Sequence, residues 1–318
     1  MPTTTLSPEK ILRDLQTQWE QLAHEEEKTG GVLRACSMTL VIAARHMEDS
    51  LEARQTAGLL MRVHPSRAIV VHSGASDSKT TEFDARVFAE CWKPFGRTQQ
   101  ICSEGIEIIA GKAGFPEVAR FLVPLRVPDL PVVLWCRGST ATQNTGYHHL
   151  FPLVDKIIFD TQNTSEADES LRSLRRLHAY GMRVADLHWA RLDGWRETIA
   201  HLFDNGLRAD EVRSARVTYG GDSTSTCGRY LEAWIRSSLP LARVSLEPTY
   251  GASGLESVTM STPQGDLTIT RAENHSLTIR GRGLDYESGL PSTSEAALMS
   301  EELSILGADN VYERVLNA

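Results

Sequence analysis

The sequence has few of the features that mark membrane, secreted or nucleic-acid-binding proteins. Its longest apolar runs, such as Pro131–Trp135, are far shorter than the roughly 20 residues needed to cross a bilayer, so no membrane-spanning segment is expected. The N-terminus lacks the basic start and continuous apolar core of a secretory signal, which favours a cytoplasmic location. Acidic residues outnumber basic ones, with a formal net charge of −8 and a pI near 5.7, and we therefore expect no nucleic-acid partner.

Cysteine is scarce and is not arranged for metal binding or redox chemistry. The five cysteines are odd in number, and no C-x-x-C pair or zinc-ligand spacing occurs among them. We therefore expect reduced thiols, as is usual in the cytoplasm. Cys91 and Cys102 are near enough in sequence to pair if the fold allows it. The full set is Cys36, Cys91, Cys102, Cys136 and Cys227.

The composition predicts a globular protein with two cores. The chain has 318 residues, of which 41% are apolar and 23% charged, and single cores usually stop growing at about 250 residues. Strand-like and helix-like segments alternate over residues 35–190, which predicts an α/β domain with an open, mostly parallel sheet. Short runs that alternate apolar with polar residues in the C-terminal third predict an antiparallel sheet. We expect an N-terminal helix in residues 1–33, an α/β domain in 34–205, and an α+β domain with an antiparallel sheet and C-terminal helices in 206–318.

Periodicity also locates individual elements. Helical spacing of apolar residues predicts helices over residues 8–28, 49–63 and 166–180. In the second helix, the residues expected to point inward are Leu51, Ala57, Leu60 and Met61. Short β-rich runs predict strands at residues 36–44, 67–71, 99–111, 132–135 and 155–161. The turn-prone pair Glu273–Asn274 predicts a hairpin in the C-terminal domain.

Motifs of common enzyme classes are missing from the sequence. Neither G-x-G-x-x-G, G-x-S-x-G nor H-E-x-x-H occurs. His148 and His149 are adjacent, so only one of them can readily face a given ligand, and His188 and His201 are 13 residues apart with no further ligands to join them. We therefore predict no metal, no cofactor and no catalytic set.

Three aspartates lie near the ends of predicted strands, where open α/β sheets usually carry their function. They are Asp129, Asp155 and Asp160. Asp160 directly follows a buried apolar run and is the strongest candidate acid or base among them. Strand-end aspartates also cap following helices, and none of the three has an evident partner acid or metal ligand.

The segment "YGGDSTSTCGRYL" at 219–231 is a candidate anion site. Gly220, Gly221, Ser223 and Thr224 precede a predicted helix whose free N–H groups could hold an anion. The alternative is that the Ser/Thr cluster caps this helix, while its apolar residues bury the inner face. Both interpretations are open at the level of sequence.

The segment Asp186–Asn205 is rich in tryptophan, histidine and arginine. From Asp193, the predicted N-cap, apolar residues recur at i, i+4, i+7 and i+8, which predicts an amphipathic helix. Its apolar stripe comprises Trp195, Ile199, Leu202 and Phe203. Half of this segment is therefore expected in a core.

Tryptophan and arginine side chains around that helix are candidates for partner binding. Trp189, Arg191 and Arg196 lie outside the apolar stripe or upstream of it, and such residues are enriched in interface hot spots. We assign Trp189, Arg191, Trp195 and Arg196 as candidate partner-binding residues. A structural Arg–Trp pair is the alternative.

Six stretches of the sequence together resemble one family. The stretches are "HPSRAIVV" (64–71), "VPDLPVVLWCRG" (127–138), "DKIIFDT" (155–161), "VADLHWARLDGWRETIAHLFD" (184–204), "CGRYLEAWI" (227–235) and "EELSILGADNVYERVL" (301–316). In that order they resemble the glucose-6-phosphate dehydrogenase assembly protein OpcA family. The resemblance runs from about residue 35 to the end, and its most specific element is the D-L-x-W-x-R-L-x-x-W-R run at Asp186–Arg196.

The resemblance implies a non-catalytic protein that binds glucose-6-phosphate dehydrogenase. Such a partner promotes assembly or allosteric activation of the dehydrogenase and supports the oxidative pentose phosphate pathway. The resemblance brings no catalytic residues with it. The alternative is a sugar-phosphate or nucleotide-binding enzyme that uses the 219–228 loop as its anion site.

Overall fold

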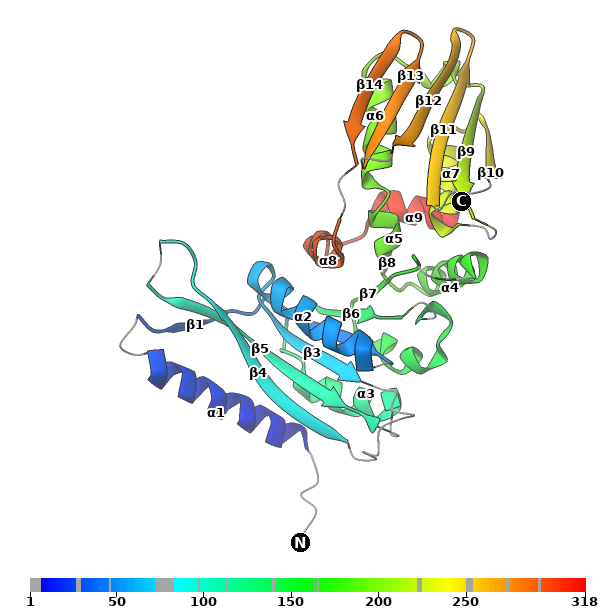
Figure 1. Cartoon of the computed structure of the whole chain (residues 1–318). Helices are drawn as coiled ribbons and strands as arrows, with labels where there is room; N and C mark the ends of the chain where they lie inside the picture. Colours follow the sequence, from blue (N-terminus) through cyan, green and yellow to red (C-terminus); the bar gives the residue numbers. More distant parts are fainter. Residues whose placement is uncertain are drawn as a thin grey trace. The chain divides into compact units, whose positions relative to one another are not determined.

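The chain divides into two compact units in the computed structural model (Figure 1). Unit 1 consists of Met1–Asp160, Met182–Val184 and Glu295–Leu306, and unit 2 consists of Thr161–Gly181, Ala185–Ser294 and Gly307–Ala318. The structure describes residues 7–26, 30–45, 47–72, 83–96, 98–111, 114–138, 141–162, 164, 166–221, 225–249, 254–272, 275–290 and 293–318.

An eight-stranded sheet forms the centre of unit 1, with the order β1-β5-β3-β2-β6-β7-β8 and with β4 paired to β5. β4 runs antiparallel to β5, whereas the pairs β1–β5, β5–β3, β3–β2, β2–β6 and β6–β7 are parallel. The strands are β1 (Val32–Arg34), β2 (Met38–Ala44), β3 (Ser66–His72), β4 (Asp84–Trp92), β5 (Gln100–Ile109), β6 (Val132–Cys136), β7 (Lys156–Phe159) and β8 (Val184–Asp186). The predicted open, mostly parallel sheet is confirmed.

The order of the parallel strands is that of the dinucleotide-binding doubly wound fold. From β2 the chain moves outward through β3 to β5, then returns to place β6, β7 and β8 on the other side of β2. When β2, β3, β5, β6, β7 and β8 are counted 1 to 6 in chain order, their order across the sheet is 3-2-1-4-5-6. The direction in which strands are added to the sheet therefore reverses between β2 and β6. Folds of this type bind ligands at that reversal, outside the carboxyl ends of the strands.

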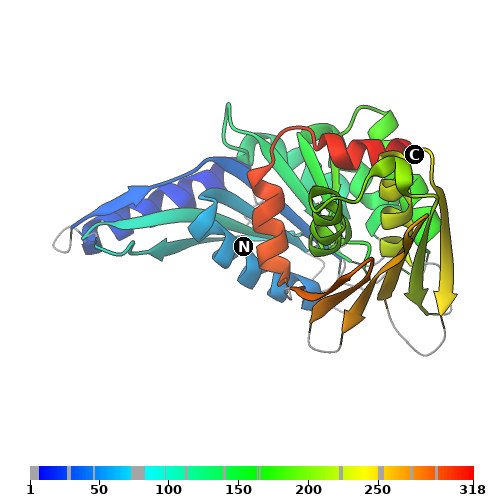
Figure 2. The same ribbon diagram turned by 90° about the horizontal axis from the view of Figure 1, so that it is seen from above.

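Helices cover both faces of this sheet, which explains the apolar runs seen in the sequence. Every residue of β2, β3, β6 and β7 is buried. α1 and α3 lie on one face of the sheet and contact each other, whereas α2 and α8 contact each other on the opposite face (Figures 1 and 2). The helices are α1 (Pro8–Glu26), α2 (Met47–Val63), α3 (Gly114–Leu125) and α8 (Glu295–Ser304). Short 3₁₀ segments, Ala141–Gln143, Thr145–His149 and Phe151–Leu153, join β6 to β7.

The predicted helices over residues 8–28 and 49–63 form as α1 and α2, within the described residues. The inward direction of Leu51 was predicted wrongly, because this side chain is 58% exposed. Ala53, Ala57 and Leu60 form the buried row at i, i+4 and i+7 instead. Leu51 lies six positions before Ala57, which places it on another side of the helix.

A disulfide bond joins Cys91 to Cys102, so the expectation of reduced thiols is wrong for this pair. The antiparallel register of β4 and β5 places the two residues directly opposite each other, with their Cα atoms 4.1 Å apart. The sequence did not predict β4, and spacing alone could not reveal this register. Cys36, Cys136 and Cys227 are free thiols.

Unit 2 contains a six-stranded sheet with the order β10-β9-β11-β12-β13-β14. The sheet is antiparallel, as predicted, except that β10 runs parallel to β9. The predicted hairpin forms from β12 and β13, while its turn residues Glu273–Asn274 lie outside the described residues. The strands are β9 (Ser214–Gly220), β10 (Arg243–Thr249), β11 (Gly254–Thr262), β12 (Gly265–Ala272), β13 (Ser276–Gly281) and β14 (Leu284–Gly289).

The helices of unit 2 gather around α7. α7 contacts β9, β10 and β11, and it also contacts α4, α5 and α9. The helices are α4 (Ala167–Ala179), α5 (Leu187–Ala190), α6 (Asp193–Asp204), α7 (Thr226–Ser238) and α9 (Asn310–Asn317), with a 3₁₀ segment at Ala209–Glu211. Within the part of the chain that the structure describes, no helix is long and apolar enough to cross a membrane.

The division between the units differs from the expected boundary at residues 205/206. Because α4 and α5 pack on α7, most of the segment 161–205 belongs to unit 2. In the other direction, α8 returns to unit 1, where the buried Lys156 of β7 holds it. Lys156 Nζ donates to Glu302 Oε2 at 2.8 Å and to the carbonyl oxygens of Glu302 at 2.8 Å and Ile305 at 2.7 Å.

Candidate functional site

Asp186, the first residue of the tryptophan- and arginine-rich segment, anchors a buried polar cluster in unit 2. It ends β8, and its carboxylate is fully buried. Oδ1 accepts hydrogen bonds from the backbone N–H groups of Thr161 (3.0 Å) and His188 (2.9 Å). Oδ2 accepts from Thr161 Oγ1 and from the Tyr230 hydroxyl, both at 2.6 Å. The cluster thereby joins β8, the start of α5 and α7.

Two tyrosines extend the cluster. The Tyr230 hydroxyl lies 2.9 Å from the Tyr312 hydroxyl, so α7 and α9 meet at this point. Burial raises the pKa of Tyr230 well above its ordinary value, and the charge of Asp186 acts in the same direction. Tyr230 therefore stays protonated and donates to Asp186. A phenol with a raised pKa suits an internal hydrogen bond better than transfer of a proton near neutral pH.

Trp189 packs against these tyrosines and beneath Arg196. Its ring centroid lies 5.8 Å from that of Tyr230 and 5.5 Å from that of Tyr312. The guanidinium carbon of Arg196 lies over the Trp189 ring at 3.8 Å from the centroid, and Arg196 also pairs with Asp193. The structure therefore contains the Arg–Trp pair that the sequence left as the alternative to a partner-binding surface.

The burial of the four candidate partner-binding residues differs. Trp189 and Trp195 are 1% and 3% exposed, so both are core residues of the chain. Arg191 is half-buried, and the Arg196 side chain is 18% exposed. The prediction that Asp193 is the N-cap of α6 is wrong, because Leu192 occupies the N-cap and Asp193 is the first helical residue. Only the two arginines offer surface to another molecule.

His188 and Cys227 bring a thiol and an imidazole together beside the cluster. Burial raises the pKa of the Cys227 thiol, but hydrogen bonding and charge from His188 outweigh it, and the pKa is lowered on balance. Ser225 Oγ lies 2.8 Å from Cys227 Sγ. Cys227 is 6% exposed, so the thiol is shielded from solvent.

The candidate anion loop is described only in part. Gly220 is the last residue of β9, and Gly221 follows it with a φ of 128°. Ser223 and Thr224 lie outside the described residues. Ser225 is the N-cap of α7, but its side chain makes no capping hydrogen bond and contacts Cys227 instead. The anion-binding role of Gly220, Gly221, Ser223 and Thr224 stays a prediction.

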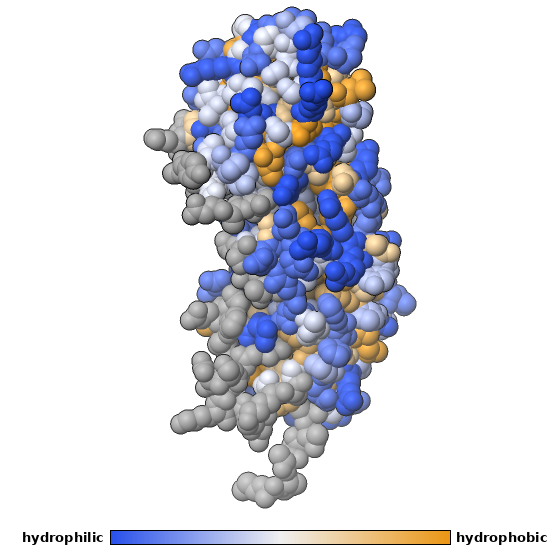
Figure 3. All heavy atoms as spheres, turned by 90° about the vertical axis from the view of Figure 1, so that its right-hand side faces the viewer, coloured by the Kyte–Doolittle hydropathy of each residue, from blue (hydrophilic) through white to orange (hydrophobic). Residues whose placement is uncertain are grey.

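A basic hollow of about 410 Å³ lies between α4 and α7. Four of its lining residues are arginines, and no sequence pattern marks them together because they are distributed over two helices. α4 and α7 are drawn toward the right in Figure 1, and Figure 3 shows that side, where hydrophilic side chains surround smaller apolar patches. The hollow is lined by Asp168, Leu171, Arg172, Arg175, Arg229, Glu232, Ala233, Arg236 and Ala318.

A second hollow of about 410 Å³ lies between α6 and α7 and is mostly apolar. Phe203, which ends the predicted apolar stripe of α6, lines it opposite Trp234 of α7. Both side chains are half-buried. The apolar stripe of α6 is therefore only partly covered by the rest of unit 2.

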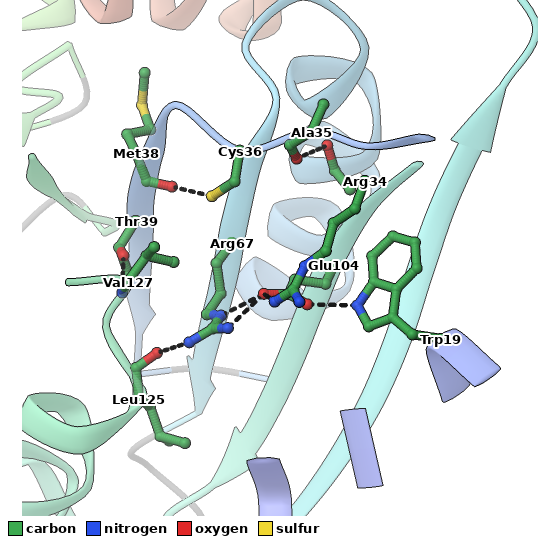
Figure 4. Close-up of polar contacts among 11 residues, drawn as sticks. Trp19, Arg34, Ala35, Cys36, Met38, Thr39, Arg67, Glu104, Leu125 and Val127 are labelled. Atoms are coloured by element: carbon green, nitrogen blue, oxygen red, sulfur yellow. Dashed lines mark hydrogen bonds and ion pairs between the residues drawn. The ribbon is translucent and has the colours of Figure 1, made fainter. Parts of the chain in front are cut away.

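Unit 1 has its own buried charge cluster around Glu104 of β5 (Figure 4). Glu104 is 2% exposed, and its Oε1 lies 2.6 Å from Arg67 Nε and 2.7 Å from Arg34 Nη2. Its Oε2 accepts a 2.7 Å hydrogen bond from Trp19 Nε1 of α1. Burial alone would raise the pKa of Glu104, but the Trp19 hydrogen bond and the two arginines hold it below its ordinary value. Arg67 also donates to the Leu125 carbonyl at 2.7 Å, so the cluster joins α1, the sheet and α3.

At the point where the strand order reverses, charged side chains of the chain itself form a cluster. Arg137 directly follows β6, and its Nη2 lies 3.1 Å from Glu52 Oε2 in α2 and 3.2 Å from Glu295 Oε2 in α8. Its guanidinium carbon lies 4.9 Å from the centroid of the Trp135 ring. The carboxylates of Glu52 and Glu295 disfavour a phosphate group at this point, where this fold type usually holds a pyrophosphate.

The strand-end aspartates and the histidines do not converge. Asp155 Oδ2 accepts from the backbone N–H of Val132 at 2.8 Å, Asp129 adopts a φ of 62°, and Asp160 is half-buried. His148 and His149 lie in a 3₁₀ segment, and His201 is exposed on α6. Among the described residues, no group of three or more histidine, cysteine, aspartate or glutamate side chains could hold a metal ion.

Comparison with protein families gives matches over both parts of the chain. Residues 57–176 match the family described as glucose-6-phosphate dehydrogenase subunit N-terminal domain, and residues 182–316 match its C-terminal domain. The change from one to the other falls between residue 176, in the last turn of α4, and residue 182, just before β8. The protein is thus a two-part chain with a doubly wound α/β unit and a second unit built on a mixed sheet. It belongs to the OpcA family of glucose-6-phosphate dehydrogenase subunit proteins.

Curated relatives bear the same family name. The OxPP cycle protein OpcA of Synechocystis sp. is 25% identical over 82% of this chain and 53% of its own length. The protein of the same name from Synechococcus elongatus is 23% identical over 82% of this chain and 55% of its own length. The chain therefore spans about half the length of these relatives.

Solved structures with a related chain path are oxidoreductases. Biliverdin reductase from Synechocystis sp. is 10% identical, with a TM-score of 0.46 over 89% of this chain and 94% of that one. The 3-ketoreductase KijD10 from Actinomadura kijaniata, in a mutant form, is 12% identical, with a TM-score of 0.49 over 88% of this chain and 93% of that one. Likenesses at this level say nothing about the ligands of this chain.

Proposed function

We propose that this chain is a non-catalytic protein that binds glucose-6-phosphate dehydrogenase and promotes its assembly or allosteric activation. In this role it would support the oxidative pentose phosphate pathway in the cytoplasm. The observation that carries the proposal is that both parts of the chain match domains described as a glucose-6-phosphate dehydrogenase subunit. The charged cluster around Arg137 at the strand reversal is in keeping with it, because it disfavours a dinucleotide in that position.

Activation needs only a modest difference in binding energy. A protein activates an enzyme when it binds the competent state more tightly than the incompetent one. A tenfold gain in substrate affinity corresponds to about 1.4 kcal/mol of coupling between the two binding events. A few interface contacts of the hot-spot kind supply free energy of that size.

The first test is the rate of glucose 6-phosphate oxidation by the same organism's dehydrogenase as a function of substrate. We expect a lower apparent KM or a higher kcat that saturates as this chain is added. Serum albumin at equal concentration controls for non-specific protein effects. Co-elution on a sizing column without a rate change would restrict the role to assembly, and neither co-elution nor a rate change would contradict the proposal.

We further propose Arg191 and Arg196 as contacts for the dehydrogenase, with Trp189 and Trp195 as the support beneath them. The buried Trp189 ring fixes the surface from which the Arg196 guanidinium extends. Arginines that are fixed in this way lose little side-chain entropy on binding.

We expect the double variant Arg191→Ala, Arg196→Ala to weaken binding of the dehydrogenase about tenfold or more, since each lost hot-spot contact costs at least about 1 kcal/mol. Surface plasmon resonance on the immobilised dehydrogenase measures the change. The matched control is Arg213→Ala with Arg216→Ala, which removes two arginines from unit 2 outside α5 and α6. Unchanged affinity in a variant with wild-type circular dichroism would show that this surface is not the contact.

The alternative function, a sugar-phosphate or nucleotide-binding enzyme with its anion site at residues 219–228, makes a different prediction. A ligand at 100 times its dissociation constant would raise the free energy of unfolding by about 2.7 kcal/mol. Thermal unfolding with NADP⁺, ATP and glucose 6-phosphate, in the wild type and in Ser223→Ala with Thr224→Ala, therefore separates the two functions. Stabilisation that the double variant abolishes would favour the enzyme.

A further inference from the structure

We propose that the hollow between α4 and α7 is a binding site for a small molecule that carries a phosphate or pyrophosphate group. The site lies wholly within unit 2 and is separate from the 219–228 loop. This inference does not depend on whether the chain binds a dehydrogenase.

The lining repeats one spacing on two helices. On α4 it follows residues 168, 171, 172 and 175, and on α7 it follows residues 229, 232, 233 and 236. Positions i, i+3, i+4 and i+7 share one face of a helix, so each helix presents a single stripe to the hollow. Each stripe supplies two arginines, which are Arg172 and Arg175 on α4 and Arg229 and Arg236 on α7.

Positive charge prevails in the hollow although the whole chain is acidic. Among the lining residues, four guanidinium groups face two side-chain carboxylates, Asp168 and Glu232, which leaves an excess of two positive charges, or one when Glu169 beside Arg172 is counted. The chain as a whole has a formal net charge of −8. A local excess of this sign attracts anions into a partly enclosed space.

The lining carboxylates hold two of the arginines in place. Glu232 Oε1 lies 2.6 Å from Arg236 Nη2, and Glu232 Oε2 lies 3.3 Å from Arg229 Nη1. Asp168 Oδ1 lies 3.3 Å from Arg229 Nε. From outside the lining, Glu169 pairs with Arg172 at 2.8 Å. Side chains oriented in advance lose less entropy when a ligand binds.

Arg175 retains donors for a ligand, and Arg229 keeps one N–H group without a hydrogen-bond partner among the described residues. Arg175 makes no ion pair or hydrogen bond with any residue that the structure describes. Arg229 Nε is buried and, among the described residues, has no hydrogen-bond partner, since its approach to Asp168 meets only the distance of an ion pair. A guanidinium group matches phosphate oxygens through two parallel N–H donors. A phosphate at Arg175 would meet its unpaired donors, and the shielded guanidinium of Arg229 would add positive charge beside it.

The size of the hollow indicates a metabolite. Its volume of about 410 Å³ lies within the range of small-molecule sites, roughly 300–1,000 Å³. Each stripe spans roughly 10 Å along its helix, at about 1.5 Å per residue, which suits a phosphorylated sugar better than an extended peptide. Leu171 and Ala233 provide an apolar wall against which the organic part of such a molecule could pack.

Isothermal titration calorimetry of the full chain without the dehydrogenase tests the site. The probes are inorganic phosphate, pyrophosphate and glucose 6-phosphate, with glucose as the uncharged control. We expect one-to-one binding of at least one phosphate probe, no binding of glucose, and about tenfold or greater loss of affinity in Arg175→Ala. Arg176→Ala is the matched control, because Arg176 is the next residue of α4, is exposed and does not line the hollow. It should leave the affinity within about twofold of wild type, as expected for a screened surface charge.

The relative affinities of the probes also identify the form of the ligand. Equal affinity for inorganic phosphate and glucose 6-phosphate would assign the free ion, and tighter binding of glucose 6-phosphate would assign the ester. The proposal fails if no phosphate probe binds at millimolar concentration, or if Arg175→Ala and Arg176→Ala weaken binding equally. It also fails if binding disappears only in Ser223→Ala with Thr224→Ala, since the anion would then occupy the loop. None of these outcomes bears on dehydrogenase binding, which the rate assay tests by itself.

Discussion

Replacement of Asp186 by alanine is expected to lower the free energy of unfolding of unit 2 by about 3–5 kcal/mol. The carboxylate is fully buried and accepts four hydrogen bonds, two from backbone N–H groups and two from the hydroxyls of Thr161 and Tyr230. Its removal leaves those donors in a cavity, and each buried donor without a partner costs about 1–3 kcal/mol. Hydrogen exchange measured by mass spectrometry on peptides from β8, α5 and α7 reports the loss within unit 2.

Two further variants make this expectation specific. Asp186→Asn keeps the shape but turns an NH₂ group toward at least one of the donors, so its cost should fall between wild type and alanine. Asp210→Asn removes an exposed carboxylate that pairs with Arg208 at 2.8 Å, and we expect no measurable change in exchange. Equal exchange rates in Asp186→Ala and Asp210→Asn would refute the assigned role of the buried cluster.

Replacement of Glu104 by glutamine is expected to destabilise unit 1 by about 3 kcal/mol, the effect of removing one partner from a buried ion pair. The Arg67 side chain is 9% exposed, so without Glu104 its charge stays buried and uncompensated. Glu90→Gln is the matched control, because Glu90 lies on the neighbouring strand and its ion pair with Arg62 is more exposed. Urea unfolding followed by hydrogen exchange in β3 and β5 should show a loss for Glu104→Gln and a change within about 0.5 kcal/mol for Glu90→Gln.

The lowered pKa of Glu104 gives this effect a defined pH dependence. A carboxyl whose pKa is lower in the folded than in the unfolded state stabilises the fold above its ordinary pKa of 4.5, and this contribution is lost as the pH falls through the folded-state pKa. The stability difference between wild type and Glu104→Gln should therefore be constant above about pH 5.5 and shrink below pH 4.5. A difference that stays constant through the acidic range would contradict the role of the ionised carboxylate.

Prediction from sequence succeeded where one local pattern is sufficient. The continuous apolar runs of β2, β3 and β6 indicated strands buried on both faces, and the parallel sheet confirmed this interpretation. It failed where two distant segments must meet. The Cys91–Cys102 bond depends on the register of β4, and the parallel pairing of β10 with β9 depends on the crossover through α7. Leu51 was misplaced because its helix buries a different row of residues.

The candidate sites show the same contrast between local sequence patterns and contacts that join distant segments. The sequence identified Trp189 and Arg196 as an unusual pair, but only the packing of α5 and α6 shows that the indole is buried and that the guanidinium covers it. Asp186 begins the most specific run of the family resemblance, yet the donors to its carboxylate include groups of Thr161, His188 and Tyr230. Such convergence has no signature at any fixed spacing in the sequence.

The sequence by itself determined the two-part α/β and α+β architecture, the lack of enzyme motifs and the family. Each of these follows from local periodicity or from short motifs, which are properties of neighbouring residues. Only the tertiary structure decided which charges are buried and paired, where the disulfide forms, and that the stripes of α4 and α7 face each other to form an arginine-lined hollow. Burial and charge pairing depend on contacts between residues far apart in the chain, and folding alone brings those residues together.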